Sequence, residues 1–173
     1  MGLFSRFKNK MEKSSVMLVT ERGNGYYAWN GNIYRSDIVR ACIRPKVKAI
    51  GKLVGKHIRE TLKADGTLDL KVNPEAYIRF LLEEPNPYMT GQKLQEKLAA
   101  QLCLNNNAFA LIIRDDAGWP NQIYPIPAVT AEMIIGRDGE PYLKFLLKNG
   151  KYATWPYSSI IHLRYDFNED DVF

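Results

Sequence analysis

The sequence predicts an α+β fold, with helices mainly in the first half and short antiparallel strands in the second. Before residue 107, apolar residues recur every three or four positions, as on one face of a helix. After residue 107, short apolar runs are separated by turns that contain Gly or Asn, as in antiparallel sheets. The 173 residues are 46% hydrophobic and 25% charged, which is ordinary for a globular domain. One domain with a single core is therefore expected.

The first 31 residues are predicted to form a basic, poorly anchored arm that ends in a loop, and residues 32–173 to form the α+β domain. The loop over residues 23–32 is rich in Gly and aromatic residues. Its Tyr26, Tyr27 and Trp29 are suited to stacking on bases, although such rings more often pin a loop to a core.

Ser36 or Asp37 is expected to begin the first long helix. Its apolar stripe is flanked by four basic residues at successive i+4 positions, Arg40, Arg44, Lys48 and Lys52. This basic row is the candidate contact with a polyanion or with another subunit. Pro45 lacks an N–H group, so the helix is predicted to kink or to restart there. Gly51 and Gly55 mark its end.

The remaining elements follow from turn and cap signals. Asp65-Gly66 predicts a hairpin over residues 56–72, and Thr90 is expected to cap a helix whose apolar face carries Leu94, Leu98 and Leu102. Three Asn residues end that helix, and residues 108–113 read as a strand covered on both faces. Other expected elements are a helix at 74–82, an extended segment at 123–127, and strands at 131–135, 142–147, 152–155 and 160–165.

Several short motifs, taken in order, resemble the portal proteins of long-tailed bacteriophages. They are Pro85-Asn86 with Thr90, then Asn106-Asn107-Ala108-Phe109, Arg114-Asp115-Asp116-Ala117-Gly118, Ile123-Tyr124-Pro125-Ile126-Pro127 and Ile160-Ile161-His162-Leu163-Arg164. The first seven residues, MGLFSRF, are also similar to the usual amino terminus of that family. Asn106 replaces the family's usual Gly, and Asn is the next residue that accepts a positive φ.

The resemblance implies a wing-like portal domain, with the stem, clip and channel-lining parts absent. It implies a structural protein of the virion, in a dodecameric ring at the capsid vertex through which DNA is packaged and ejected and to which the tail attaches. The implied partners are other portal subunits, capsid protein, terminase, head-tail adaptor proteins and the DNA that passes through the ring, with no membrane. Assembly would take place in the host cytoplasm, from a phage or prophage gene.

The net charge of +5 conceals an asymmetry along the chain. Residues 1–63 hold 14 Lys and Arg against 4 Asp and Glu, a net charge of +10, whereas residues 64–173 hold 10 against 15, a net charge of −5. Such a distribution suits contact with a polyanion or head-to-tail packing between copies; a well-solvated basic helix is the alternative. A stand-alone nucleic-acid-binding module that uses the basic row is therefore the second functional hypothesis.

No catalytic, cofactor or metal site is predicted. His57 and His162 are far apart in sequence, and His162 lies in an apolar strand as a structural histidine would. Cys42 and Cys103 are on apolar helical faces, which favours structural free thiols in a reducing compartment. The segment from Gly51 to His57 fails as a phosphate-binding loop, because it has one residue too few and no Ser or Thr for the metal. A hydrolase with an unrecognised acidic site has no positive feature in its favour.

Overall fold

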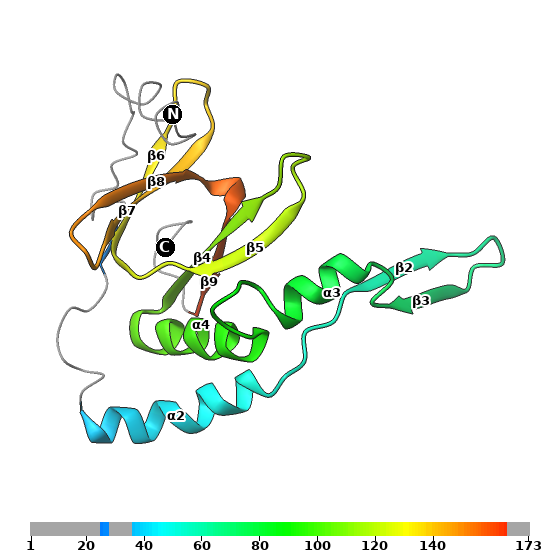
Figure 1. The fold of residues 1–173 in the computed structure, drawn as a ribbon, viewed down its shortest axis with the longest axis horizontal. Helices are drawn as coiled ribbons and strands as arrows, with labels where there is room; N and C mark the ends of the chain where they lie inside the picture. Colours follow the sequence, from blue (N-terminus) through cyan, green and yellow to red (C-terminus); the bar gives the residue numbers. More distant parts are fainter. Residues whose placement is uncertain (1–24, 28–35, 166–173) are drawn as a thin grey trace.

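The computed structural model describes residues 25–27 and 36–165 and confirms the α+β prediction (Figure 1). The elements in chain order are β1 (Gly25–Tyr27), α2 (Asp37–Gly51), β2 (Ile58–Leu62), β3 (Leu68–Val72), α3 (Ala76–Glu83), α4 (Gly91–Asn105), β4 (Asn107–Arg114), β5 (Pro120–Pro125), β6 (Ala128–Ile135), β7 (Pro141–Leu147), β8 (Tyr152–Pro156), η2 (Tyr157–Ser159) and β9 (Ile160–Arg164). None of the described helices is long and apolar enough to cross a lipid bilayer.

The strands form three antiparallel sheets. One has the order β1-β6-β7-β8, another β5-β4-β9, and β2 pairs only with β3. The central strand β4 organises the body of the molecule, because its successive side chains point to opposite faces. Ala108 and Ala110 belong to a cluster with Leu94 and Leu98 of α4. Phe109 points the other way, so the first half of β4 is covered on both faces as predicted, whereas Ile113 near its end is exposed.

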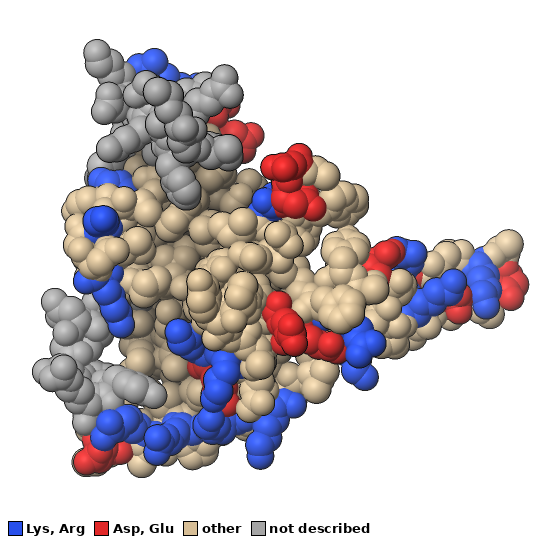
Figure 2. Space-filling view, viewed as in Figure 1, with Lys and Arg blue, Asp and Glu red and all other residues tan. Residues whose placement is uncertain are grey.

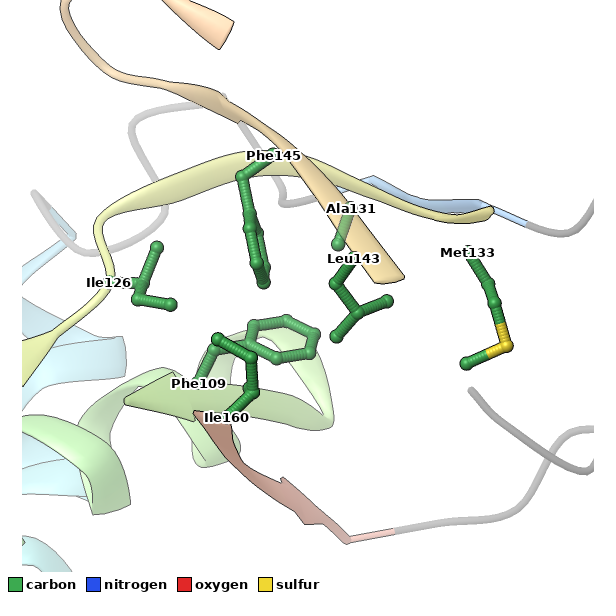
Figure 3. Close-up of a cluster of buried hydrophobic side chains, with 7 residues drawn as sticks. All are labelled: Phe109, Ile126, Ala131, Met133, Leu143, Phe145 and Ile160. Carbon is green, nitrogen blue, oxygen red and sulfur yellow. The ribbon is translucent and has the colours of Figure 1, made fainter. Parts of the chain in front are cut away.

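Phe109 is at the centre of the larger apolar cluster, between the β5-β4-β9 sheet and the β6-β7-β8 strands. Figure 3 shows its ring beneath Phe145 and beside Leu143. The two phenyl rings meet edge to face, with centroids 5.2 Å apart and planes at 72°. This arrangement suits the ring quadrupoles. The two sheets are therefore joined by aromatic packing.

The ends of α4 agree with the sequence prediction. The Thr90 hydroxyl accepts a hydrogen bond from the Lys93 N–H at 3.4 Å. At the other end Asn106 adopts the left-handed conformation with φ of 57°, and its N–H reaches the Leu102 carbonyl. Asn is one of the few residues besides Gly that take this conformation readily.

Three local predictions differ from the structure in whole or in part. Of the two outcomes predicted at Pro45, a kink or a restart, the restart is wrong, since α2 is one helix from Asp37 to Gly51. The carbonyl of Ala41, which Pro45 leaves without a donor, belongs to an exposed residue where water is an adequate partner. Cys42 is exposed instead of lying on a buried face.

The third difference concerns the glycine-rich loop. Gly25–Tyr27 is a strand that pairs antiparallel with β6, with Tyr26 opposite Ala131. Tyr has a high strand propensity, and an unpaired sheet edge was available to it. Trp29 and the predicted arm fall within residues 1–24 and 28–35, outside the described part of the chain.

The β2–β3 hairpin forms as predicted and extends away from the rest of the molecule in Figure 1. At its tip the Asp65 carboxylate accepts hydrogen bonds from the Thr67 N–H at 2.9 Å and the Thr67 hydroxyl at 2.6 Å. Gly66 has φ of +82°, which only Gly adopts without strain.

Candidate assembly surface

The basic row lies along α2, at the lower edge of the molecule in Figure 2. Arg44, Lys48 and Lys52 are exposed, and Arg40 is half-buried. The apolar stripe beside the row faces inward, with Val47 buried and Ile43 and Ile50 half-buried. The helix is therefore amphipathic, and its cationic side is accessible to solvent.

Two of the four basic residues have acidic partners within the chain. Arg40 forms an ion pair with Asp37 one turn away, and the Lys48 Nζ is 2.9 Å from the Glu96 Oε1. Arg44 and Lys52 form no ion pair with any described residue. Within the described residues, about half of the row's charge is therefore balanced, and Arg44 and Lys52 are the members without an acidic partner there.

Glu96 ties α2 to α4. Its carboxylate is buried and accepts a hydrogen bond from the Lys48 Nζ on Oε1 and one from the Lys93 Nζ on Oε2, the latter at 2.9 Å. These two ammonium groups lower the pKa of Glu96 to about 2. A Cβ on Gly51 would lie 2.5 Å from the Glu96 Cγ, so Gly at this position permits the close approach of the helices. Sequence reasoning missed the contacts of Glu96 with Lys48 and Lys93, because a Glu in a polar stretch of a helix normally lies at the surface.

An apolar groove lies between α2, α4 and the end of β9. Its volume is about 200 Å³, and its lining includes Ile50, Leu98, Leu102, Cys103 and Leu163. Lys46 is at its rim, where its Nζ donates a hydrogen bond to the Tyr165 hydroxyl at 3.2 Å. This hydrogen bond raises the pKa of Lys46.

His162 is half-buried and is held by neutral hydrogen bonds. Its Nε2 is 2.7 Å from the Asn107 Oδ1, and its Nδ1 is 3.2 Å from the Tyr157 hydroxyl. A carbonyl oxygen only accepts, so Nε2 donates and Nδ1 accepts from the tyrosine. The ring stacks on Phe109 with centroids 4.5 Å apart. These contacts fit the predicted structural histidine, and they unite two distant motifs, because β4 and β9 pair Phe109 with His162.

The other motif residues also serve the architecture. Asn86 is buried, donates to the Ile123 carbonyl at 2.7 Å, and accepts from the Tyr88 N–H at 3.0 Å. The Asp115 carboxylate accepts from the N–H groups of Ala117 at 3.0 Å and Trp119 at 2.8 Å, which closes the turn between β4 and β5. The motif residues thus cap a helix, join separate segments by hydrogen bonds, or close a turn.

Among the described residues, no group of three or more His, Cys, Asp or Glu side chains is placed to hold a metal ion. His57 is at the base of the β2–β3 hairpin, and His162 lies between the two larger sheets. The structure therefore does not bring the two histidines together. What the described surface offers is a basic helix side, an apolar groove and an exposed hairpin.

A sequence model of the phage portal protein family matches residues 37–173. The chain belongs to the phage portal protein family. The portal protein of Enterobacteria phage HK97 is 35% identical over 92 residues, which are 53% of this chain and 21% of that protein. The chain thus spans about a fifth of that curated portal protein.

Solved structures share the fold of this chain. The chain resembles one from the neck of an empty gene transfer agent particle computed with C6 symmetry, with a TM-score of 0.62 and 16% identity over 90% of this chain and 43% of that one. A second, from the neck of the native particle computed with C12 symmetry, has a TM-score of 0.58 and 14% identity over 95% of this chain and 41% of that one.

The half-buried His162 is expected to make this portal chain sensitive to acid. Burial, aided by the charge of Arg164, lowers the pKa of His162 from 6.5 to about 4. The folded state therefore favours the neutral ring, and its stabilising effect is present above pH 6.5 and is lost as the pH falls toward 4. Because the ring is partly exposed, we expect a loss of about 1–2 kcal/mol across this window. Urea unfolding at several pH values measures it.

The test variant is His162→Gln. It is expected to be less stable at pH 7 and to lose most of the pH dependence between 6.5 and 4. An unchanged slope in His162→Gln would show that other groups produce it.

Proposed function

We propose that this chain is a structural part of the portal ring at the capsid vertex of a tailed phage, through which DNA is packaged and ejected and to which the tail attaches. In this role the chain supplies contacts to neighbouring subunits and to capsid protein, and it performs no chemistry. The family match over residues 37–173 is the observation that carries the proposal. The motif residues support it, because Asn86, Asn107, Asp115 and His162 are engaged in packing and hydrogen bonds.

The proposed assembly is a ring of identical subunits within the virion, with terminase and head-tail adaptor proteins as further partners. Related chains occur in particle necks computed with C6 and C12 symmetry, which supports a ring. A closed ring brings two different surfaces of each copy into contact. The uneven charge along the chain suits such head-to-tail contacts.

The location of the chain in particles tests this role. Particles are produced by inducing the strain that encodes the gene, with an epitope tag on the chain, and are purified. We expect the chain in the particles at a fixed low copy number, with gold-labelled antibody at one vertex. Absence from particles, or label spread over the shell, would contradict a portal role.

The alternative role is a stand-alone nucleic-acid-binding module that uses Arg40, Arg44, Lys48 and Lys52. The ion pairs of Arg40 and Lys48 make this row a weaker polyanion site than four free cations would be. We propose instead that Arg44 and Lys52 face an acidic protein surface in the assembly. Cations on the same side of a helix repel one another, and a partner surface of opposite charge relieves this repulsion.

The double variant Arg44→Gln, Lys52→Gln tests the row without disturbing Glu96. We expect stability to change by less than about 0.5 kcal/mol, because both side chains are exposed. Incorporation into particles is expected to fall, while binding to duplex DNA keeps its weak affinity and salt slope. Lys97→Gln, an exposed change on α4, is the control. A salt slope reduced by about two would instead indicate two phosphate contacts and favour the nucleic-acid module.

A further inference from the structure

The β2–β3 hairpin has one apolar and one polar face. Cross-strand partners share a face, and the register pairs Ile58 with Val72, Glu60 with Leu70, and Leu62 with Leu68. One face therefore carries five aliphatic side chains and a single carboxylate. The opposite face pairs Arg59 with Lys71 and Thr61 with Asp69, so it is entirely polar.

The apolar face is exposed. Its five aliphatic residues are 53–69% accessible, and the hairpin extends away from the body of the molecule (Figure 1). Its anchoring is at the base, where Arg59 pairs with Glu75 and the His57 N–H donates to the Asn73 Oδ1 at 3.1 Å. A two-stranded hairpin without a packed face is marginally stable in water, and contiguous exposed apolar surface marks an interaction site.

A neighbouring copy of this chain is the partner that the observations favour. Under the proposed ring, each copy offers two different surfaces, so a projecting apolar face needs an apolar hollow elsewhere on the same chain. The groove between α2, α4 and β9 is such a hollow. Apolar cavities of about 150 Å³ accept a benzene molecule, so this groove of about 200 Å³ has room for an aliphatic side chain.

Charge also favours this pairing. Glu60 lies at the centre of the apolar hairpin face, and it forms no ion pair with any described residue. The groove has one basic side chain in its lining, Lys46, at its rim. A buried carboxylate is tolerated in an interface only when it meets a cation or a hydrogen-bond donor.

We propose that the apolar face of the β2–β3 hairpin docks into the α2–α4–β9 groove of a neighbouring copy, with Glu60 toward Lys46 at the rim of that groove. This inference rests on the proposed function, since it supplies the contact between subunits of the ring. One hairpin in one groove is a small interface, well under about 1,000 Å², so association of the isolated chain is weak. Covalent capture is therefore the suitable test.

The chain has two cysteines, and Cys103 lines the groove. In a Cys42→Ser background, Leu70→Cys places a thiol on the apolar hairpin face, and Lys71→Cys places one on the polar face. We expect a short bismaleimide to link Leu70→Cys of one copy to Cys103 of the next, which gives a ladder of oligomers and a 70–103 cross-linked peptide by mass spectrometry. The Lys71→Cys variant is expected to give about tenfold less product, and adding Cys103→Ser to Leu70→Cys should abolish the ladder.

The same cross-linking on purified particles separates this inference from the proposed function. If the chain is present at one vertex but the 70–103 peptide is absent, the hairpin contact is wrong and the portal role stands. If the chain is absent from particles, the portal role is wrong. Links between two copies of position 70, or equal products from positions 70 and 71, would also overturn the inference. Leu68→Cys, on the same face, replaces Leu70→Cys if circular dichroism shows that the latter is unfolded.

Discussion

Replacing Phe109 by alanine is expected to lower the free energy of unfolding by about 3–5 kcal/mol, enough to unfold much of the protein at 37 °C. Phe109 is 2% exposed and belongs to the central strand β4. Its ring meets Phe145 edge to face and stacks on His162, so it joins both larger sheets. Truncation would leave a cavity that rigid strands on either side cannot fill.

Chemical denaturation monitored by tryptophan fluorescence measures this loss. Ile113→Ala is the matched control, since Ile113 belongs to the same strand but is 39% exposed. Its expected cost is about 1 kcal/mol, because its side chain already contacts water in the folded state. Phe109→Leu should fall between the two. A cost below about 1 kcal/mol for Phe109→Ala would mean that the two sheets are held together mainly elsewhere.

Local signals allowed most of the fold to be predicted from sequence. Thr90, Asn106 and Asp65-Gly66 act within a few residues of themselves, so their cap, stop and turn roles follow from side-chain chemistry alone. Period-two and helical patterns identified the strands and helices for the same reason. Tyr26 was misread because its strand depends on pairing with β6, about 100 residues later in the chain.

The basic row, the groove and the exposed hairpin face also depend on contacts, or on the lack of them, between residues far apart in the sequence. Lys48 read as one of four equivalent cations, whereas in the structure it is committed to Glu96 on another helix. The groove is built from α2, α4 and β9, and no one segment contains its pattern. The hairpin was predictable as a hairpin. Apolar and polar residues alternate along its strands, and this pattern normally indicates that one face is buried. The pattern therefore did not predict that the apolar face of the hairpin would be exposed.

The family motifs acquire a physical meaning from these contacts. Asn107 and His162 are 55 residues apart in sequence and 2.7 Å apart in space. Asn86 connects the segment before α4 to β5 through Ile123. Residues that carry the portal resemblance are thus those that fix one element against another. This explains why the resemblance predicted the fold well and identified no chemical site.

Gly91→Ala is expected to destabilise the protein by about 2–3 kcal/mol, although alanine is the better helix former by about 1 kcal/mol. Gly91 is the first residue of α4 and is buried. A Cβ there would lie far inside van der Waals contact of the Leu82 carbonyl oxygen, and 3.4 Å from that of Glu83. Both are backbone atoms at the end of α3, so no side-chain rotation relieves the overlap, and α3 must separate from α4. The steric term therefore exceeds the gain in helix propensity.

Thermal unfolding of Gly91→Ala beside Lys97→Ala distinguishes these two effects. Lys97 is exposed in the same helix, and its replacement by alanine changes propensity without a steric consequence. We expect Lys97→Ala to lie within about 0.5 kcal/mol of the original chain. We expect Gly91→Ala to unfold about 4–12 °C earlier, from a shift of about 2–4 °C per kcal/mol for a chain of this size. Equal or higher stability of Gly91→Ala would mean that the α3–α4 junction is looser than its backbone contact indicates, and that α3 and the hairpin before it move freely relative to α4.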